Sequence, residues 1–424
     1  MLASKANMTG NLSGLVDIFK RPISVSGLLS GFLSGSSMCG YPVASFCQDA
    51  LTVFALSSVS APVKPGLHHY LGEKSAMDRN LCQNIRHGLM NLSSRFCVAL
   101  LLSLTFLGTA FAADHAVILM YHRFGEDKYP STNIRLEQFD AHLEKLSDGN
   151  YSVLPLAKII EHLQTGKPLP DRTVAITIDD AYLSVFTEAW PRLKAKGFPF
   201  TVFVATNPVD QNHRNYMSWD QLRLLQADGV GIGSQTASHP HMHEISIDAV
   251  DTELAKANER FLTELGMRPN LFAYPYGEYN LTVIDRVKAA GFIAGFGQNS
   301  GIAHGFDGFF ELPRFAMNER YGEMDRLSLA INGLPLKANQ VLPADVVIAK
   351  NPPVFGFTLA LEIANENNLQ CFNSTYNALE VTRLGPRAEV RFPGPLPSGR
   401  ARVNCTMPGP DGRWRWFGKQ FLVP

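Results

Sequence analysis

The sequence predicts an α/β protein in two parts, a closed, irregular barrel followed by a small antiparallel β-sandwich. Over about residues 116–296, apolar strands alternate with amphipathic helices in about seven units, which is typical of a mainly parallel sheet. Over 354–424, apolar and polar residues instead alternate between turns such as the Pro-Asp-Gly sequence at 410–412, which indicates antiparallel strands. The proline-rich, irregular stretch 334–353 between the two patterns is predicted to be a linker.

The elements of the first part follow from apolar runs and from capping residues. Strands are expected at 116–121, 173–180, 200–205, 230–234, 271–274 and 292–296. Helices are expected at 136–146, 156–163, 185–195, 219–229, 247–265 and 281–290. Ser218, Ser246 and Asn280 are expected to cap helix starts, because their side-chain oxygens can accept free backbone N–H groups. Gly266 and Gly291 are expected to end the last two helices.

The composition indicates a globular protein rather than a nucleic-acid-binding one. The 424 residues carry a formal net charge of zero, and 18% of them are charged. No basic stretch suggests a nucleic-acid partner. Glycine, proline and aromatic residues are plentiful, which suits a secreted protein with many loops.

Residues 90–113 have the features of a secretory signal peptide. Arg95 supplies a basic start, 96–106 an apolar centre, and Ala110 and Ala112 the small residues of a cleavage site. The apolar centre is short for a bilayer span, so we expect no permanent membrane anchor.

We therefore expect a periplasmic or secreted mature chain that begins at Ala113 or Asp114. Residues 1–89 show no repeat or motif, and we expect translation to start at Met90, so that 1–89 are not part of the mature protein.

The cysteines agree with export. Four of the six precede the predicted cleavage point, and only Cys371 and Cys405 follow it. An even number of cysteines in an oxidising compartment predicts one disulfide within the second part of the chain. The alternative is a pair of buried free thiols.

Polar residues gather at four predicted strand ends, namely His122, the adjacent Asp179 and Asp180, the segment 235–243 and the segment 274–278. Each has an ordinary structural interpretation, since a histidine often lies in a hydrogen-bonded loop and Asp180 could cap a helix. Strand ends of α/β folds face one rim, however, and this rim would collect carboxylates and imidazoles. The set predicts a mononuclear divalent-metal site with a free carboxylate as base and a further histidine as acid.

Three segments in order, TIDD (177–180), SQTASHPH (234–241) and FAYPYG (272–277), resemble the first three motifs of the polysaccharide deacetylases with the NodB homology domain, carbohydrate esterase family 4. The resemblance runs from about residue 117 to 315. It implies a distorted (β/α)7 barrel and a metal-dependent hydrolase that removes N-acetyl groups from an amino-sugar polysaccharide. The segment MYHRF (120–124) resembles the variant found in deacetylases of biofilm poly-N-acetylglucosamine.

The resemblance also assigns roles to individual residues. Asp179 matches the catalytic base, and Asp180 and His239 match metal ligands. The backbone N–H of Tyr276 matches a donor to the oxyanion, and His122 matches the general acid of the biofilm variant.

Two positions depart from the family pattern. Gln235 stands where the first metal histidine is expected, and Ala273 stands where an arginine orients the base. An amide oxygen binds zinc less well than imidazole does, so His243 could complete the metal site instead. Pro240 argues against His239 and His243 sharing one regular helix. Without the arginine, we expect the Asp179 carboxylate to be less well held, with a less depressed pKa.

The favoured function is therefore deacetylation of an N-acetylated polysaccharide of the cell envelope or biofilm, with a divalent metal, zinc being favoured. The alternative is a catalytically inactive carbohydrate-binding protein on the same scaffold, because fold does not imply activity. The aromatic residues Tyr182, Trp219, Tyr276 and Tyr279 could stack on sugars or belong to the core. The sequence does not indicate an oligomeric state.

Overall fold

The computed structural model describes residues 112–306, 308–363 and 367–424, which belong to one compact unit. The predicted start site, residues 1–89 and the signal peptide up to residue 111 lie outside the described residues. Within the described ranges no helix is long and apolar enough to cross a bilayer. The first described strand, β1 (Ala112–Ala113), pairs with β6 (Leu169–Pro170).

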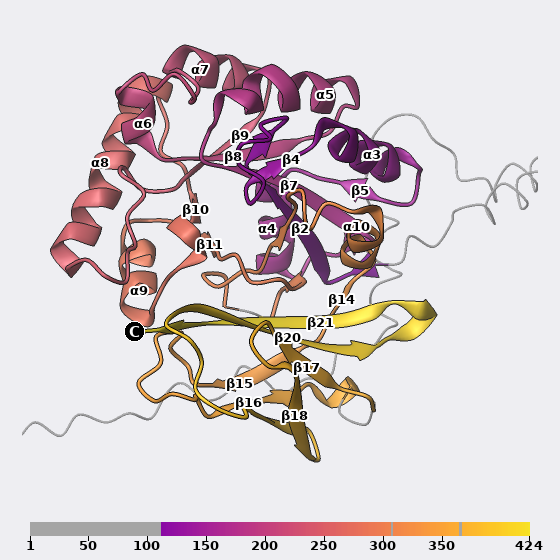
Figure 1. The fold of residues 1–424 in the computed structure, drawn as a ribbon. Helices are drawn as coiled ribbons and strands as arrows, with labels where there is room; N and C mark the ends of the chain where they lie inside the picture. Colours follow the sequence, from indigo (N-terminus) through magenta and orange to yellow (C-terminus); the bar gives the residue numbers. More distant parts are fainter. Residues whose placement is uncertain (1–111, 307, 364–366) are drawn as a thin grey trace, which may run out of the picture. The chain divides into compact units, whose positions relative to one another are not determined.

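The first part of the chain is built on a nine-stranded sheet (Figure 1). Its main path runs β11-β10-β9-β8-β7-β2-β12, with β5 beside β7 and β13 beside β2, and every pairing except β2–β12 is parallel. The strands are β2 (His115–Tyr121), β5 (Ser152–Val153), β7 (Thr173–Asp179), β8 (Phe200–Val204), β9 (Gly231–Ser234), β10 (Leu271–Ala273), β11 (Ala294–Phe296), β12 (Ala303–His304) and β13 (Phe315–Ala316). Strands β2 and β7 are buried along their whole length, because side chains cover both faces of a parallel sheet.

The two edges of this sheet are joined by one segment. Leu312 pairs with Phe296 of β11, and its carbonyl accepts the Gly297 N–H at 3.0 Å. Three residues further on, Phe315 in β13 pairs with Leu119 of β2. The sheet is therefore curled, with the same short segment in contact with β11 and β2.

Three helices begin at the predicted capping residues. They are α3 (Leu136–Ser147), α4 (Leu156–Thr165), α5 (Trp190–Ala195), α6 (Thr206–Asp210), α7 (Trp219–Ala227), α8 (Ile247–Leu265), α9 (Leu281–Ala289) and α10 (Met324–Ile331). Ser218, Ser246 and Asn280 each accept a backbone N–H at the start of α7, α8 and α9, as predicted. Gly266 follows α8 in the left-handed conformation, with a φ of 67°. Helices α6 and α10 were not predicted.

The helix expected at 185–195 is split. Residues Val185–Ala189 form a π-helical turn, and the α-helix α5 begins only at Trp190. Pro191 lies at the start of α5 and has no N–H, so it removes one intrahelical hydrogen bond and favours a change of winding at this point.

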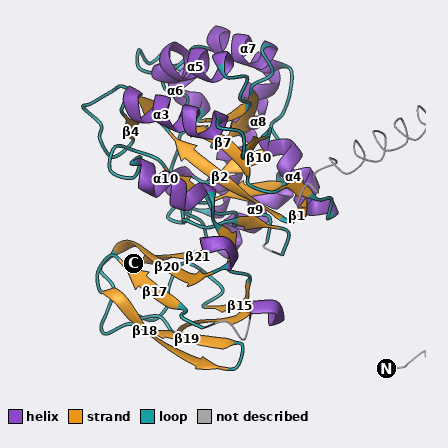
Figure 2. Ribbon diagram, turned by 90° about the vertical axis from the view of Figure 1, so that its right-hand side faces the viewer, coloured by secondary structure: helices purple, strands orange, loops and turns teal. Residues whose placement is uncertain are grey.

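The second part of the chain is an eight-stranded sheet in the order β14-β21-β20-β17-β18-β19-β16-β15 (Figure 2). Its strands are β14 (Leu334–Pro335), β15 (Ala338–Leu342), β16 (Phe355–Leu359), β17 (Gln370–Asn373), β18 (Asn377–Leu384), β19 (Arg387–Arg391), β20 (Gly399–Pro408) and β21 (Trp414–Val423). The stretch 334–353, predicted to be a linker, supplies β14 and β15 at the two ends of this order. The Phe355 ring of β16 lies 5.4 Å from the Phe421 ring of β21, so the sheet folds over a shared core. Pairing follows one path through all eight strands, and the β-sandwich stays a prediction.

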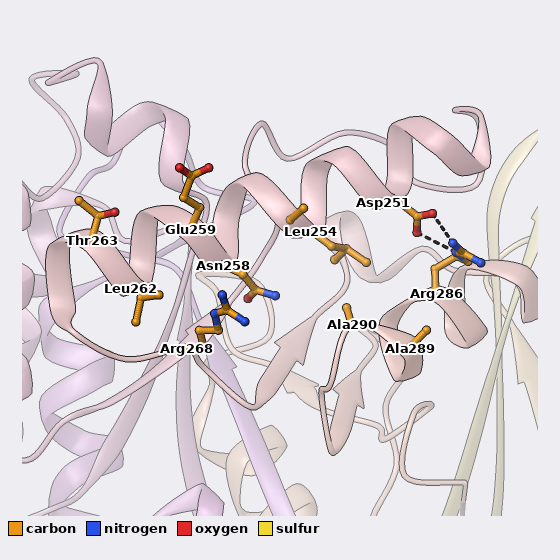
Figure 3. A pocket seen from close by; sticks show the side chains of 11 residues that line it. Asp251, Leu254, Asn258, Glu259, Leu262, Thr263, Arg268, Arg286, Ala289 and Ala290 are labelled. Carbon is orange, nitrogen blue, oxygen red and sulfur yellow. Dashed lines mark hydrogen bonds and ion pairs between the residues drawn. The ribbon is translucent and has the colours of Figure 1, made fainter.

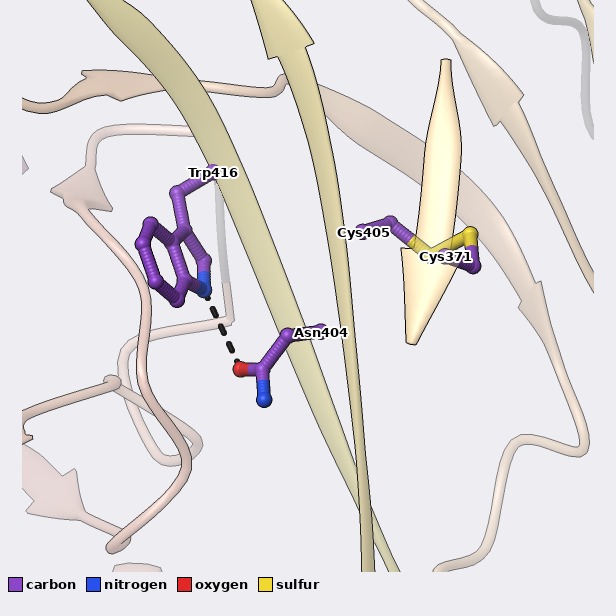
Figure 4. The surroundings of a disulfide bond; sticks show 4 residues. All are labelled: Cys371, Asn404, Cys405 and Trp416. Atoms are coloured by element: carbon purple, nitrogen blue, oxygen red, sulfur yellow. Dashed lines mark hydrogen bonds between the residues drawn. A yellow bond between two sulfur atoms is a disulfide. The ribbon is translucent and has the colours of Figure 1, made fainter. Parts of the chain in front are cut away.

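The expected disulfide joins Cys371 of β17 to Cys405 of β20 (Figure 4). The two cysteines are direct partners in the β17–β20 pairing, and both are buried. The bridge therefore connects neighbouring strands in the middle of the sheet. The neighbouring residue Asn404 accepts a hydrogen bond from the Trp416 indole N–H at 3.1 Å.

We expect removal of this bridge to destabilise the C-terminal sheet. The cysteines are 34 residues apart, and in the chain-entropy model a bridge of this span contributes about 3–4 kcal/mol to the free energy of unfolding. The double variant Cys371→Ala/Cys405→Ala should show a corresponding fall in the denaturant midpoint of the C-terminal sheet. Two reactive thiols in denatured, unreduced exported protein would contradict the bridge.

Candidate active site

The site is centred on a buried ion pair between Asp179 and Arg314. Asp179 is the last residue of β7, and its Oδ1 and Oδ2 accept hydrogen bonds from Arg314 Nη1 and Nη2 at 2.7 and 2.8 Å. Both side chains are 0% exposed. Arg314 Nε also donates to the Gly297 carbonyl at 2.9 Å, which fixes the plane of the guanidinium. The Asp179 carboxylate is thus held in one orientation by a bidentate, charge-assisted hydrogen-bonded ion pair.

Arg314 corrects the expectation that Asp179 is weakly held. Ala273 occupies the position where an arginine was expected, and the structure brings a guanidinium to Asp179 from the segment before β13 instead. One feature of the sequence could have identified Arg314 as the partner of a buried carboxylate. Arg314 lies in the apolar run 312–317, and a charged side chain in a buried run requires a partner.

His122 lies beside this ion pair. It follows β2, the parallel neighbour of β7, so the two strands end at the same rim of the sheet. Its Nε2 is 4.0 Å from Asp179 Oδ2, and its side chain is 14% exposed. The imidazole therefore reaches both the buried carboxylate and the open cleft described below.

Asp180 turns away from the strand and meets two of its predicted partners. It has a φ of 74°, which directs its side chain off the line of β7. Its Oδ1 lies 3.3 Å from His239 Nε2. Its backbone N–H donates to Oε1 of the buried Gln235 at 3.3 Å. Asp180 is not a helix cap, and the structure brings Asp180, His239 and Gln235 together.

The protonation states of the pair depend on each other. Burial acts to raise the pKa of Asp180, but the adjacent imidazole of His239 and the nearby imidazole of His122 outweigh it and lower this pKa to about 2. Burial acts to lower the pKa of His239, but the adjacent Asp180 carboxylate outweighs it and raises that pKa. Asp180 is therefore negatively charged at neutral pH and can attract a cation.

The donor atoms of these three residues fit a divalent cation. Asp180 Oδ1 and Gln235 Nε2 are buried and lack a hydrogen-bond partner. Gln235 Oε1 accepts the Asp180 N–H and has a second lone pair that a cation can use. Asp180, His239 and Gln235 thus bring a carboxylate, an imidazole and an amide oxygen close together. No cluster of three His, Cys, Asp or Glu side chains suited to a metal occurs within the described ranges, so the third ligand here would be Gln235.

His243 lies elsewhere. Its Nδ1 is 3.6 Å from Glu278 Oε2, and its Nε2 is 3.5 Å from Glu244 Oε1. Glu278 also accepts a hydrogen bond from His241 Nδ1 at 2.5 Å. The structure does not bring His243 to Asp180 and His239.

A cavity of about 530 Å³ opens over these residues. Of the four aromatic residues considered as sugar-stacking walls, Tyr182 and Tyr276 line it. Trp219 is buried against Phe261, and Tyr279 is buried against Tyr274. The lining includes residues from both parts of the chain: His122, Asp180, Tyr182, Tyr216, His239, Tyr276, Tyr321, Arg400 and Arg402.

Another hollow, of about 420 Å³, lies between α8 and α9 (Figure 3). Asp251 and Arg286 form an ion pair at one end of it. None of the predicted site residues lines this hollow, and it contributes nothing to the chemistry at the rim of the sheet.

Comparison with known proteins identifies the class. Residues 166–295 match the family model described as polysaccharide deacetylase. The resemblance identified from the three motifs is thereby confirmed.

The individual relatives have names more specific than that of the family model. A Bacillus subtilis (strain 168) protein, YxkH, whose name places it among the polysaccharide deacetylases, is 25% identical over 197 residues, or 46% of this chain and 69% of that protein. The poly-β-1,6-N-acetyl-D-glucosamine N-deacetylase of Escherichia coli (strain K12) is 25% identical over 38% of this chain. The protein of the same name from Staphylococcus aureus (strain MRSA252) is 24% identical over 44% of this chain.

The match covers 68% of the Staphylococcus aureus protein but only 30% of the Escherichia coli protein. Among solved structures, the deacetylase PplD of Streptococcus pyogenes, in complex with acetate, gives a TM-score of 0.48 at 23% identity, over 51% of this chain and 98% of that one.

Loss of Arg314 should strongly destabilise the protein. Arg314→Met leaves the buried Asp179 carboxylate without its cation, a change that typically costs about 3–5 kcal/mol. The free energy of unfolding from urea titration measures this directly. In the double variant Asp179→Asn/Arg314→Met, part of the loss should be recovered, because no unpaired charge remains. Equal losses in the single and double variants would show that the ion pair is not the source of the effect.

Proposed function

We propose that this protein is a metal-dependent hydrolase that removes N-acetyl groups from an amino-sugar polysaccharide of the cell envelope or biofilm. The observation that carries the proposal is the arrangement at one rim of the sheet. There the Arg314-held Asp179 lies 4.0 Å from His122, next to the group of Asp180, His239 and Gln235. The relatives named as N-deacetylases support the choice of substrate class.

Asp179 is the proposed general base. Both of its oxygens already accept hydrogen bonds from Arg314, so the carboxylate cannot rotate away from an attacking water. Each oxygen still has a lone pair, and one of these can accept the proton of the water. Its proposed contribution rests on this fixed orientation toward the attacking water.

His122 is the proposed general acid. The amine that leaves in deacetylation needs a proton, and a histidine can deliver one near neutral pH. His122 lines the cavity and lies close to Asp179, so a proton taken from water by one group is near the other.

Asp180, His239 and Gln235 are the proposed ligands of a divalent metal, zinc being favoured. When bound, such an ion polarises the amide carbonyl and lowers the pKa of water. The backbone N–H of Tyr276 donates to no other group in the described part of the chain, and it is the proposed donor to the oxyanion.

The proposal also includes the domain architecture and the cellular location of the protein. The contacts of the segment 312–316 with β11 and β2 support a distorted (β/α)7 barrel over 114–333, and the shared core of the folded sheet supports a β-sandwich over 354–424. The signal-like segment 90–113 and an N-acetylated polymer as partner support a periplasmic or secreted enzyme. The alternative, an inactive carbohydrate-binding protein, is favoured by one observation, namely that an amide stands where the family has a metal-binding histidine.

Variants of the two carboxylates should separate base from ligand. Asp179→Asn should abolish acetate release from an N-acetylglucosamine oligomer while bound metal stays near the wild-type level, because an amide cannot accept the water's proton. Asp180→Asn should lower metal content and activity together. Metal analysis and an acetate assay on the same preparations measure both. Identical metal content and activity in the two variants would refute this division of roles.

Gln235 should decide between the enzyme and its alternative. Gln235→His should raise zinc affinity, because imidazole is the better ligand for this ion. His243→Ala is the matched control and should leave zinc affinity near the wild-type value, because His243 faces Glu278. Zinc titration of chelator-treated protein gives both affinities. If wild-type protein binds an N-acetylated glycan but neither binds zinc nor releases acetate, the inactive binding protein is the better description.

A further inference from the structure

The C-terminal sheet makes direct contact with the loop that carries Tyr276. Arg400 of β20 donates from Nη1 to the Tyr276 carbonyl at 2.6 Å. Gln420 of β21 donates from Nε2 to the next carbonyl along, that of Gly277, at 2.9 Å. Two adjacent strands of the second part of the chain thus hold two successive peptide groups of the first.

The loop needs such support because its backbone is strained. Tyr276 has a φ of 58° and a ψ of 5°, a left-handed conformation that side chains other than glycine rarely adopt. A strained residue of this kind keeps its conformation only when its surroundings impose it. Gly277 follows with a φ of 69°, and a Cβ there would lie 2.5 Å from the Cβ of Gln298. Neither residue can relax without moving the loop.

A second set of contacts connects Arg400 to the ring of Tyr276. Arg400 Nε lies 3.3 Å from Oε1 of the buried Glu278. Glu278 Oε2 accepts the hydrogen bond from His241. The His241 ring stacks on the Tyr276 ring, with centroids 4.0 Å apart and planes 8° apart. Arg400 therefore holds the Tyr276 backbone directly and supports its ring through Glu278 and His241.

The face of the sheet that makes these contacts is closely fitted to the first part of the chain. Arg400 and Arg402 lie on one face of β20, and Gln420 is the cross-strand partner of Arg402. Two residues before Gln420, a Cβ on Gly418 would lie 2.0 Å from the Ser300 carbonyl oxygen. The Gly418 carbonyl accepts a hydrogen bond from the buried Asn299 side chain at 3.0 Å. Only glycine allows this approach.

Together these contacts fix the direction of the Tyr276 N–H. This N–H shares a peptide plane with the Pro275 carbonyl, which accepts the Glu278 N–H at 3.0 Å. The position of Glu278 depends in turn on the two peptide planes between it and Tyr276, and these are the planes bound by Arg400 and Gln420.

We propose that the C-terminal sheet completes the deacetylation site, with Arg400 and Gln420 as positioning residues that aim the Tyr276 N–H at the oxyanion. The inference rests on the proposed function. It assigns the sheet a part in the reaction itself, apart from any polymer that the sheet binds. A donor to the oxyanion acts in the transition state and much less in the ground state, so its misplacement lowers kcat more than it changes KM.

The test uses the full mature chain and two variants. Arg400→Ala removes the contact to Tyr276, and Gln420→Glu keeps the side-chain size but removes the N–H that binds Gly277. Each should lower kcat about ten- to hundredfold, the scale expected for a misplaced catalytic group, with KM within about twofold of wild type. Arg400→Lys keeps one donor and should recover part of the loss. Arg391→Ala, an exposed arginine of β19 in the same sheet, is the matched control and should leave kcat unchanged.

Hydrogen exchange provides a readout that does not depend on activity. The Gly277 and Glu278 amides bond to the carbonyls of Tyr274 and Pro275, so they report whether the loop is closed. Both amides should exchange faster in Arg400→Ala and Gln420→Glu than in Arg391→Ala, while thermal unfolding stays cooperative. Wild-type exchange at these amides, or wild-type kcat, in both variants overturns the inference. If wild-type protein releases no acetate, the proposed function fails, and the exchange rates alone decide whether the sheet holds the loop.

Discussion

The buried contact between Asp179 and Arg314 is the constraint on which the rest of the site depends. A carboxylate and a guanidinium with no exposure to water are stable only if each satisfies the other with good geometry. Arg314 can reach Asp179 because the segment 312–316 crosses from β11 to β2. The segment that contacts both β11 and β2 is therefore also the one that brings the guanidinium to Asp179.

The geometry around this pair explains how two adjacent aspartates can have different roles. Asp179 stays in line with β7 and is enclosed by Arg314, whereas Asp180 adopts a left-handed backbone and turns toward His239. Burial acts against charge on Asp180, and the neighbouring imidazoles outweigh it. One carboxylate is thus matched to a fixed internal cation, and the other contacts the His239 imidazole at the cavity.

The second part of the chain is physically continuous with the cleft. Arg400 and Arg402 line the cavity together with His122 and His239, and the glycine at 418 allows close backbone contact. The buried Gln420 and the close approach at Gly418 fix the register of this interface. A shift of one residue along β20 and β21 would turn these side chains to the other face of the sheet. The sheet is better described as a wall of the site than as an appended module.

Local features of the sequence were sufficient for several helix starts, the positions of most strands in the first part of the chain and the residues of the three motifs. A cap such as Ser246 binds an N–H three residues away, and an apolar run such as 116–121 reports its own burial, so both can be read within a short window. The disulfide followed from there being only two cysteines after the predicted cleavage point. The tertiary structure alone decided the partner of Asp179, the separation of His243 from Asp180, and the contacts from Arg400 to Tyr276. Asp179 and Arg314 are 135 positions apart in the sequence, and Tyr276 and Arg400 are 124 apart. The path of the chain between such residues is set by tertiary packing and not by local conformational preference.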